Sequence, residues 1–171
     1  MRKISKTFLF LSMIALVIWL GSYITRYFSV FSLFEPESLT LNKTFDSTAL
    51  SGALTIIASI ITISFFSYPF FIICFIIFII TSKMNIKHEG WLFMMIVIVI
   101  ITSPFEIFLM TFDYKYLISI VENIQSNDYL LSQLVKRIKA LNSFPIIEIL
   151  TYFFFIFLFI FRPFRKLNHE N

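Results

Sequence analysis

The stretch from Leu50 to Thr81 decides the fold class, because it reads LSGALTIIASIITISFFSYPFFIICFIIFIIT and contains no charged residue. A helix of this length measures about 48 Å, whereas the hydrocarbon core of a bilayer is about 30 Å thick. Two crossings would need about 40 residues and a turn. We therefore expect one membrane helix that tilts, kinks at Pro69 or projects beyond the bilayer. A broken or re-entrant arrangement at Ser67-Tyr68-Pro69 is the alternative.

The composition also indicates an integral membrane protein. Of the 171 residues, 58% are hydrophobic and 14% are charged, whereas a soluble domain carries about 25% charged residues. The net charge of +4 does not indicate nucleic-acid binding, because the basic residues flank apolar runs and so fit membrane topology and lipid headgroups. The single cysteine, Cys74, excludes an internal disulfide and a cysteine metal cluster. We expect neither a metal nor a cofactor.

Three further apolar runs complete the predicted architecture. We expect an all-α integral membrane protein, a four-transmembrane-helix bundle that forms a single membrane domain over residues 1–171. Arg2, Lys3 and Lys6 precede the first run, which resembles a secretory signal. It lacks a convincing cleavage site, so we interpret it as an uncleaved signal-anchor. The spans are predicted at about 7–24, 50–81, 90–112 and 145–161.

The two long connections, 25–49 and 113–144, are predicted to be outer loops on the same side of the membrane. The second loop has two sets of apolar residues at helical spacing, separated by the N-cap signal Ser126-Asn127-Asp128. We therefore expect two short amphipathic interfacial helices between spans 3 and 4. These helices either lie in the headgroup layer or cap the bundle and bind a partner.

The positions of Lys and Arg indicate the orientation. A small excess of them lies on the side of the two termini, so both termini are expected in the cytoplasm. The expected location is a bacterial cytoplasmic (inner) membrane. At the far end of the first span, Trp19, Tyr23 and Tyr27 fit an aromatic belt at the membrane interface.

Glu106 and Glu148 are the candidate functional residues, because an ionisable side chain at the centre of a membrane costs about 2.5–3.5 kcal/mol. Spans 3 and 4 run in opposite directions, yet the two carboxylates are expected at similar depths, roughly 10 Å and 8 Å below the outer surface. Hydroxyl groups share the helix faces of the two glutamates at spacings of three and four residues. Together with the glutamates they form a candidate intramembrane polar site, and they belong to Thr102, Ser103, Thr151 and Tyr152.

Three roles are open for the two glutamates. As a close pair they would share a proton or bind a cation, because each charge disfavours the ionisation of the other. Alternatively, they would pair with Arg26, with a basic group of the amphipathic helices, or with another subunit. In the third interpretation each glutamate lies near enough to the interface to reach water, and Glu148 is stabilised by the dipole of its helix.

A separate stripe of small residues lies in the span 50–81. Gly52, Thr55, Ser59 and Thr62 recur at spacings of three and four residues. Small residues at this spacing let helices approach closely in lipid. We expect this face to pack within the bundle or against a partner, and a polar permeation path is the alternative.

The sequence contains none of the motifs that would indicate an enzyme, such as HExxH, GxSxG, a P-loop or GxGxxG. We therefore expect an accessory or assembly subunit of a larger membrane complex, such as a secretion, sorting or transport system. The alternative is a small transporter or ion- or proton-coupled membrane protein that uses Glu106 and Glu148, and an intramembrane enzyme ranks third. The expected partners are the lipid bilayer and other membrane subunits or further copies of the chain, but not nucleic acid.

Overall fold

The computed structural model describes residues 3–35, 40–42, 44–84, 89–122, 126–140 and 144–163. Within these ranges the chain forms five helices, which are α1 (Lys3–Ser32), α2 (Ser47–Ser82), α3 (Gly90–Val121), α4 (Asn127–Ala140) and α5 (Phe144–Phe161). Between α1 and α2, Phe34 and Leu41 form an isolated antiparallel bridge. Four of these helices, α1, α2, α3 and α5, are long and apolar enough to cross a membrane. The predictions of an all-helical chain and of four helices able to cross a membrane are therefore confirmed.

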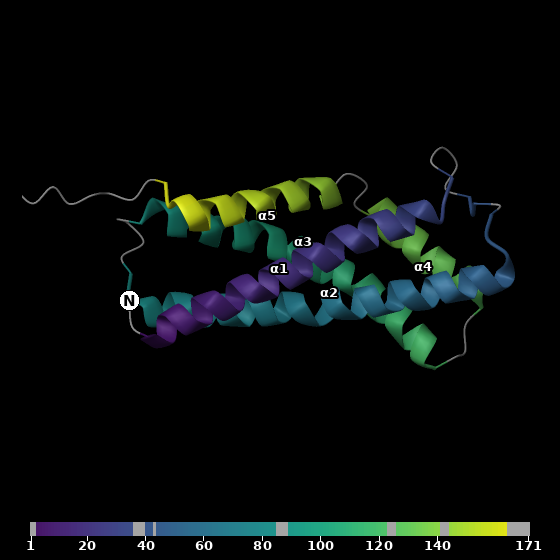
Figure 1. Cartoon of the computed structure of the whole chain (residues 1–171), viewed down its shortest axis with the longest axis horizontal. Coiled ribbons are helices and arrows are strands. Elements are labelled where there is room, and N and C mark those ends of the chain that lie inside the picture. The colour runs from purple at the N-terminus through teal and green to yellow at the C-terminus, as the bar shows by residue number, and fades with distance from the viewer. Residues whose placement is uncertain are drawn as a thin grey trace, which may run out of the picture.

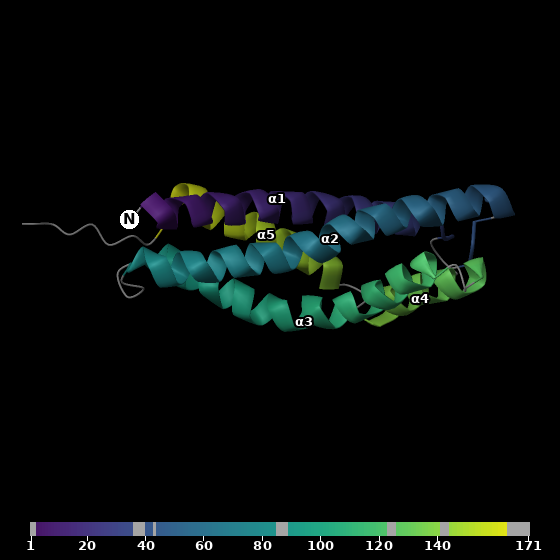
Figure 2. The same ribbon diagram turned by 90° about the horizontal axis from the view of Figure 1, so that it is seen from below.

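The four long helices alternate in direction, and α4 covers one end of the bundle (Figure 1). α2 packs along α1 in the opposite direction, α3 returns beside α2, and α5 lies against α3 and α1. Residues 3 and 163 therefore lie at the same end of the molecule, which we call the terminal end. At the other end, the α4 end, α4 packs against α3 and α2 (Figure 2).

α4 takes the place of the two predicted interfacial helices. The expected first helix is instead the end of α3, because residues 113–121 contain neither Pro nor Gly to stop the helix. α4 begins at Asn127, and its residues Leu130 and Leu134 are buried in a hydrophobic cluster with α1, α2 and α3. The apolar stripe of α4 therefore faces protein, and the helix caps the bundle.

α2 is one helix from end to end. It begins after Asp46, whose side-chain Oδ1 atom accepts a hydrogen bond of 2.7 Å from the backbone N–H of Ala49, as an N-cap does. The helix passes through Pro69 and ends at Ser82, and the next residue, Lys83, has a left-handed backbone with a φ of 49°. The run 50–81 thus forms the single helix predicted from its length, and not a broken segment.

The different helix lengths place the bilayer along the bundle. α5 has 18 residues and measures about 27 Å, close to the hydrocarbon thickness of about 30 Å. α2 has 36 residues and measures about 54 Å, and α1 and α3 are also much longer than α5. We therefore infer that these three helices extend beyond the bilayer by roughly 20 Å at the α4 end. We call this part of the bundle the overhang, and α4 packs beside it (Figure 2).

The exposed side of α2 changes character at the start of this overhang. Its exposed residues up to Ser59 are small or hydroxylated, apart from Ile56. Its exposed large residues from Ile63 to Ile80 are all Ile or Phe. Because lipid favours an apolar surface and water a polar one, the membrane boundary crosses α2 between Ser59 and Ile63.

The interior consists of two hydrophobic clusters with a polar layer between them. One cluster, toward the terminal end, joins α1, α2, α3 and α5 around Trp19 and Phe71. The other, in the overhang, joins α1, α2, α3 and α4 around Leu54 and Leu134. On the long helices, buried polar or charged residues lie where one cluster gives way to the other. They include Arg26, Ser64, Glu106, Asp113 and Glu148.

Cysteine labelling tests this placement of the bilayer. In a Cys74→Ser background, Thr55→Cys and Ile73→Cys each put one thiol on the exposed side of α2. Position 55 lies in the overhang and position 73 in lipid, so in nanodiscs a membrane-impermeant maleimide is expected to label position 55 and leave position 73 unmodified. Equal labelling of the two positions would show that α2 does not cross the bilayer at this level.

Candidate functional site

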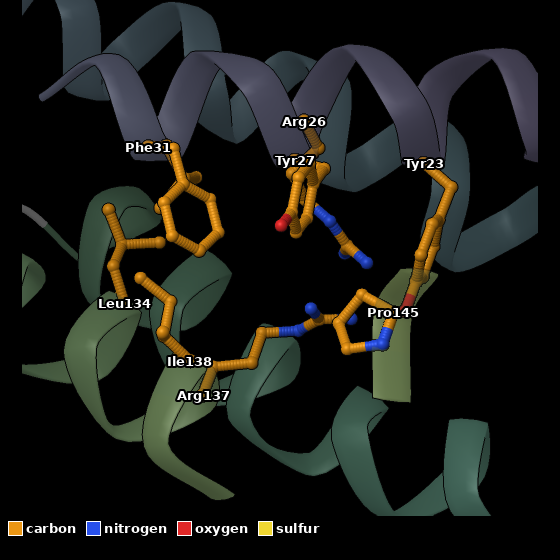
Figure 3. Close-up of a pocket in the computed structure, with 9 residues that line it drawn as sticks. Tyr23, Arg26, Tyr27, Phe31, Leu134, Arg137, Ile138 and Pro145 are labelled. Atoms are coloured by element: carbon orange, nitrogen blue, oxygen red, sulfur yellow. The ribbon is translucent and has the colours of Figure 1, made fainter. Parts of the chain in front are cut away.

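Asp113 joins three helices through two ion pairs. Its Oδ2 atom lies 2.8 Å from Nη1 of Arg26 on α1, and its Oδ1 atom lies 2.8 Å from Nε of Arg137 on α4. Figure 3 shows the two arginine side chains reaching toward each other from opposite sides. The side chains of Arg26 and Asp113 are 3% and 4% exposed, so removing one partner would leave a buried, uncompensated charge.

Arg137 remains charged in this setting. Burial lowers the pKa of its guanidinium, but the negative groups around it, Asp113 first and Glu106 second, outweigh burial and raise the pKa above its ordinary value. A guanidinium is protonated throughout the physiological range in any case. The ion pair between Arg137 and Asp113 therefore holds α4 to the bundle at any physiological pH, in addition to the packing of the apolar side of α4.

Glu106 of α3 and Glu148 of α5 lie at the same level on facing helices. They are 1% and 0% exposed. α3 and α5 are antiparallel (Figure 1), and the Thr102 hydroxyl lies 2.8 Å from the Tyr152 hydroxyl. One helical turn from this contact, α3 reaches Glu106 and α5 reaches Glu148. The two carboxyl groups interact electrostatically with each other and with both arginines.

Several polar atoms around this pair lack partners. Within the described ranges, both carboxylate oxygens of Glu148 and the Oε2 atom of Glu106 are buried without a hydrogen bond. The Tyr23 hydroxyl lies beside Glu148, and the Trp19 indole N–H lies beside Glu106. Neither group makes a hydrogen bond of good geometry to any residue that the structure describes. The carboxyl pair therefore has two hydrogen-bond donors close by, but neither makes a well-formed hydrogen bond to it.

The hydroxyl groups of the site bond to one another. Thr102 donates to the carbonyl of Ile98 at 2.9 Å, and since a hydroxyl has a single proton, it accepts from Tyr152 at 2.8 Å. The Tyr68 hydroxyl of α2 donates to Ser103 Oγ at 3.2 Å. Its oxygen also lies 3.1 Å from the Tyr152 hydroxyl. This chain of hydroxyls connects α2, α3 and α5 beside the carboxyl pair.

The buried cluster contains more acids than bases. Its guanidinium groups belong to Arg26 and Arg137, and its carboxyl groups belong to Asp113, Glu106 and Glu148. If all five groups were ionised, the cluster would carry one negative charge in excess. A single proton on the glutamate pair makes it neutral.

The structure brings together five of the six predicted polar-site residues. Thr102, Ser103 and Tyr152 join the hydroxyl chain next to Glu106 and Glu148. The sixth, Thr151, points elsewhere, and its hydroxyl donates to the carbonyl of Ile147 on its own helix at 2.7 Å.

The predicted packing stripe lies away from this cluster. Gly52, Thr55 and Ser59 are exposed and Thr62 is half-buried. The hydroxyls of Thr55, Ser59 and Thr62 each donate to a backbone carbonyl one turn earlier in α2. Most of this stripe faces outward from the overhanging half of α2.

Sequence reasoning missed the central role of Asp113 and misplaced two aromatic residues. Asp113 follows Glu106 by seven residues, or about two helical turns, so both lie on one face of α3, and this spacing is the signal that identifies it. Trp19 and Tyr23, expected in an interfacial belt, are instead 0% and 1% exposed inside the bundle. Their polar atoms lie beside the two glutamates, which explains their burial.

Comparison of the chain with protein-family models, curated proteins and solved structures finds no match. The most informative chemical feature is the buried pair Glu106 and Glu148. Together with Asp113 they make three acids, and the cluster has only two arginines to balance them.

Replacing Asp113 tests whether it holds α1 and α4 to α3. Asp113→Asn leaves two buried guanidinium groups without a counter-charge, so we expect a loss of about 3–5 kcal/mol in the free energy of unfolding. The matched control is Asp128→Asn, which removes an exposed carboxylate from the first turn of α4. Thermal unfolding in mild detergent measures both, and equal midpoints for the two variants would show that the ion pairs contribute little.

Proposed function

We propose that this protein is a small proton-coupled membrane protein, of the transporter class, in which Glu106 and Glu148 together take up and release a proton. The observation that supports this function best is the pairing of two fully buried carboxyl groups on facing helices. Three of their oxygens have no hydrogen-bond partner in the described part of the chain. A buried carboxylate without partners is costly, and like charges at one site disfavour double ionisation.

A proton fits this pair better than a metal ion. Arg26 and Arg137 lie within electrostatic reach of both glutamates and repel a cation. Among the residues described, no three His, Cys, Asp or Glu side chains are grouped as a metal site would need. One bound proton is also enough to neutralise the single excess negative charge of the cluster. The same pair can therefore alternate between one and two bound protons as its surroundings change.

A small pocket gives this pair a route to water. The pocket lies between α1 and α4, is lined by Tyr23, Arg26 and Arg137, and has a volume of about 30 Å³. A water molecule needs about 10–15 Å³ of such space, so the pocket accommodates two. Because Tyr23 lines the pocket and its hydroxyl lies beside Glu148, protons can reach the carboxyl pair through this side chain.

The proposed orientation places this pocket near the outer surface of a bacterial cytoplasmic membrane. Lys3, Lys6 and Arg162 lie at the terminal end of the bundle, and flanking basic residues favour the cytoplasm. With the termini inside, the overhang and α4 project outward. The carboxyl pair then lies close to the outer interface and far from the cytoplasmic one.

A role as an accessory or assembly subunit is the second candidate, supported by a different observation. Three large apolar side chains of the overhang, Phe28, Ile56 and Val121, are 68%, 64% and 80% exposed. Since this region lies beyond the hydrocarbon core, a protein partner would cover them better than lipid. This role depends on the surface of the overhang and not on protonation of the glutamates, so variants of the carboxyl pair separate the two functions.

Infrared spectroscopy of the protein in nanodiscs tests the proposed proton site. At neutral pH the wild-type protein is expected to show the carbonyl stretch of a protonated, buried carboxyl group. Glu106→Gln and Glu148→Gln should each abolish this band, because the remaining glutamate then balances the charges of the cluster as a carboxylate. Glu122→Gln, which changes an exposed carboxylate at the end of α3, should leave the band intact.

Two results would reject the proton site. One is the absence of a protonated-carboxyl band in the wild-type protein. The other is a band that persists unchanged in both glutamine variants, which would place the proton elsewhere in the chain.

A further inference from the structure

The pocket between α1 and α4 combines charged donors with apolar walls. Figure 3 shows Tyr27 and Phe31 of α1 on one side of it and Leu134 and Ile138 of α4 on the other. The first residues of α5 close it at Pro145. Since α5 begins where the bundle emerges from lipid, this pocket lies at the level of the phospholipid headgroups.

Two charged donors at this pocket have no acceptor in the described parts of the chain. They are Nη2 of Arg26 and Nη2 of Arg137, and both side chains line the pocket. Arg26 is 3% exposed, so bulk water does not satisfy it. Leaving a buried charged donor unpaired costs at least about 1–3 kcal/mol, which an acceptor placed in the pocket would recover.

The charges of the cluster specify the kind of acceptor. When both glutamates are protonated, Arg26 and Arg137 outnumber Asp113 by one positive charge. A monoanion balances this excess, whereas a doubly charged phosphate exceeds it. The volume of about 30 Å³ fits the two oxygens of one carboxylate group in place of two water molecules, and guanidinium groups bind carboxylates strongly.

We propose that this pocket binds the carboxylate group of an apolar monocarboxylic acid, and that one proton is bound at Glu106 and Glu148 for each acid bound. The second half of this statement rests on the proposed proton site. Because the carboxylate group fills the pocket, the apolar tail of the ligand extends outward past the half-buried side chains of Phe31 and Ile138. No covalent bond forms or breaks, and the proton comes from the surrounding water.

Electroneutrality links the two binding events. With the pocket empty, one glutamate is ionised and the cluster is neutral. With a carboxylate bound, both glutamates are protonated and the cluster is neutral again. The charged or titratable groups that surround the pair come from all five helices, and are Tyr23, Arg26, Tyr68, Asp113, Arg137 and Tyr152.

Hexanoate is a suitable probe for this site. Binding of radiolabelled hexanoate to the full-length protein in zwitterionic nanodiscs, corrected for empty nanodiscs, is expected to saturate at one molecule per chain. Inorganic phosphate and hexanol should not compete. In weakly buffered, mildly alkaline solution, a pH indicator should report the uptake of one proton per hexanoate bound.

Four variants separate the parts of this proposal. Arg137→Lys keeps the charge but loses Nη2, and should weaken binding about tenfold or more, as for the loss of one charge-assisted hydrogen bond. Ile138→Trp fills the pocket without altering the ion pairs and should abolish binding. Lys139→Gln removes a neighbouring exposed charge and should bind normally. The double variant Glu106→Gln/Glu148→Gln should bind hexanoate without proton uptake.

The outcomes distinguish this inference from the proposed function. Hexanoate that fails to saturate, or that binds equally well to Ile138→Trp, overturns the carboxylate site, while the infrared band of the glutamates still decides the proton site. Competition by inorganic phosphate overturns the choice of a monocarboxylate. Proton uptake that persists in the double glutamine variant shows that the acid binds in its neutral form, which overturns the coupling.

Discussion

Charge buried in an apolar bundle must be paired, and this constraint organises the junction between the two halves of the molecule. Asp113 meets it by binding Arg26 and Arg137 at once, so one carboxylate connects α1, α3 and α4. Without this connection, α4 would be held by its apolar stripe alone, and two arginines would be left at the level where the core changes from one hydrophobic cluster to the other. The short length of α5 makes room for α4 at this level, because α5 begins where the overhang ends (Figure 2).

The buried charge of the two glutamates, which lie deeper in the bundle than Asp113, is not paired in this way. Asp113 uses both arginines, so Glu106 and Glu148 remain without a direct basic partner in the described structure. The nearby hydroxyls of Thr102, Ser103 and Tyr152 bond to one another and to Tyr68, not to the carboxyl groups. The imbalance of acids and bases is the physical reason that the pair holds a proton in our account. The free donors of the pocket have a different cause, because each arginine uses one nitrogen for Asp113 and leaves Nη2 without an acceptor.

Hydropathy and helix length were enough to predict the four apolar helices, the unbroken course of α2 through Pro69 and the similar depth of the two glutamates, whereas their burial was one of several interpretations. Hydropathy ended the third span near Phe112, although residues 113–121 contain no helix breaker. Packing of α4 and α2 on these residues stabilises the part of α3 that extends beyond the apolar run. Spacing along α3 was sufficient to associate Asp113 with Glu106. The burial of Trp19 and Tyr23 was not predictable from their type, because the same residues are common in interfacial belts.

The most direct test of this account is whether positions 106 and 148 meet within one chain. In a Cys74→Ser background, Glu106→Cys/Glu148→Cys should form an intrachain cross-link in membranes with a short bifunctional thiol reagent, independent of protein concentration. Glu106→Cys/Leu150→Cys is the matched control, because Leu150 is 64% exposed and lies two residues after Glu148, on the opposite side of α5. Efficient cross-linking of the first pair alone is the predicted result. Equal cross-linking of both pairs, or none of the first, would contradict the facing carboxyl pair on which the proposed chemistry depends.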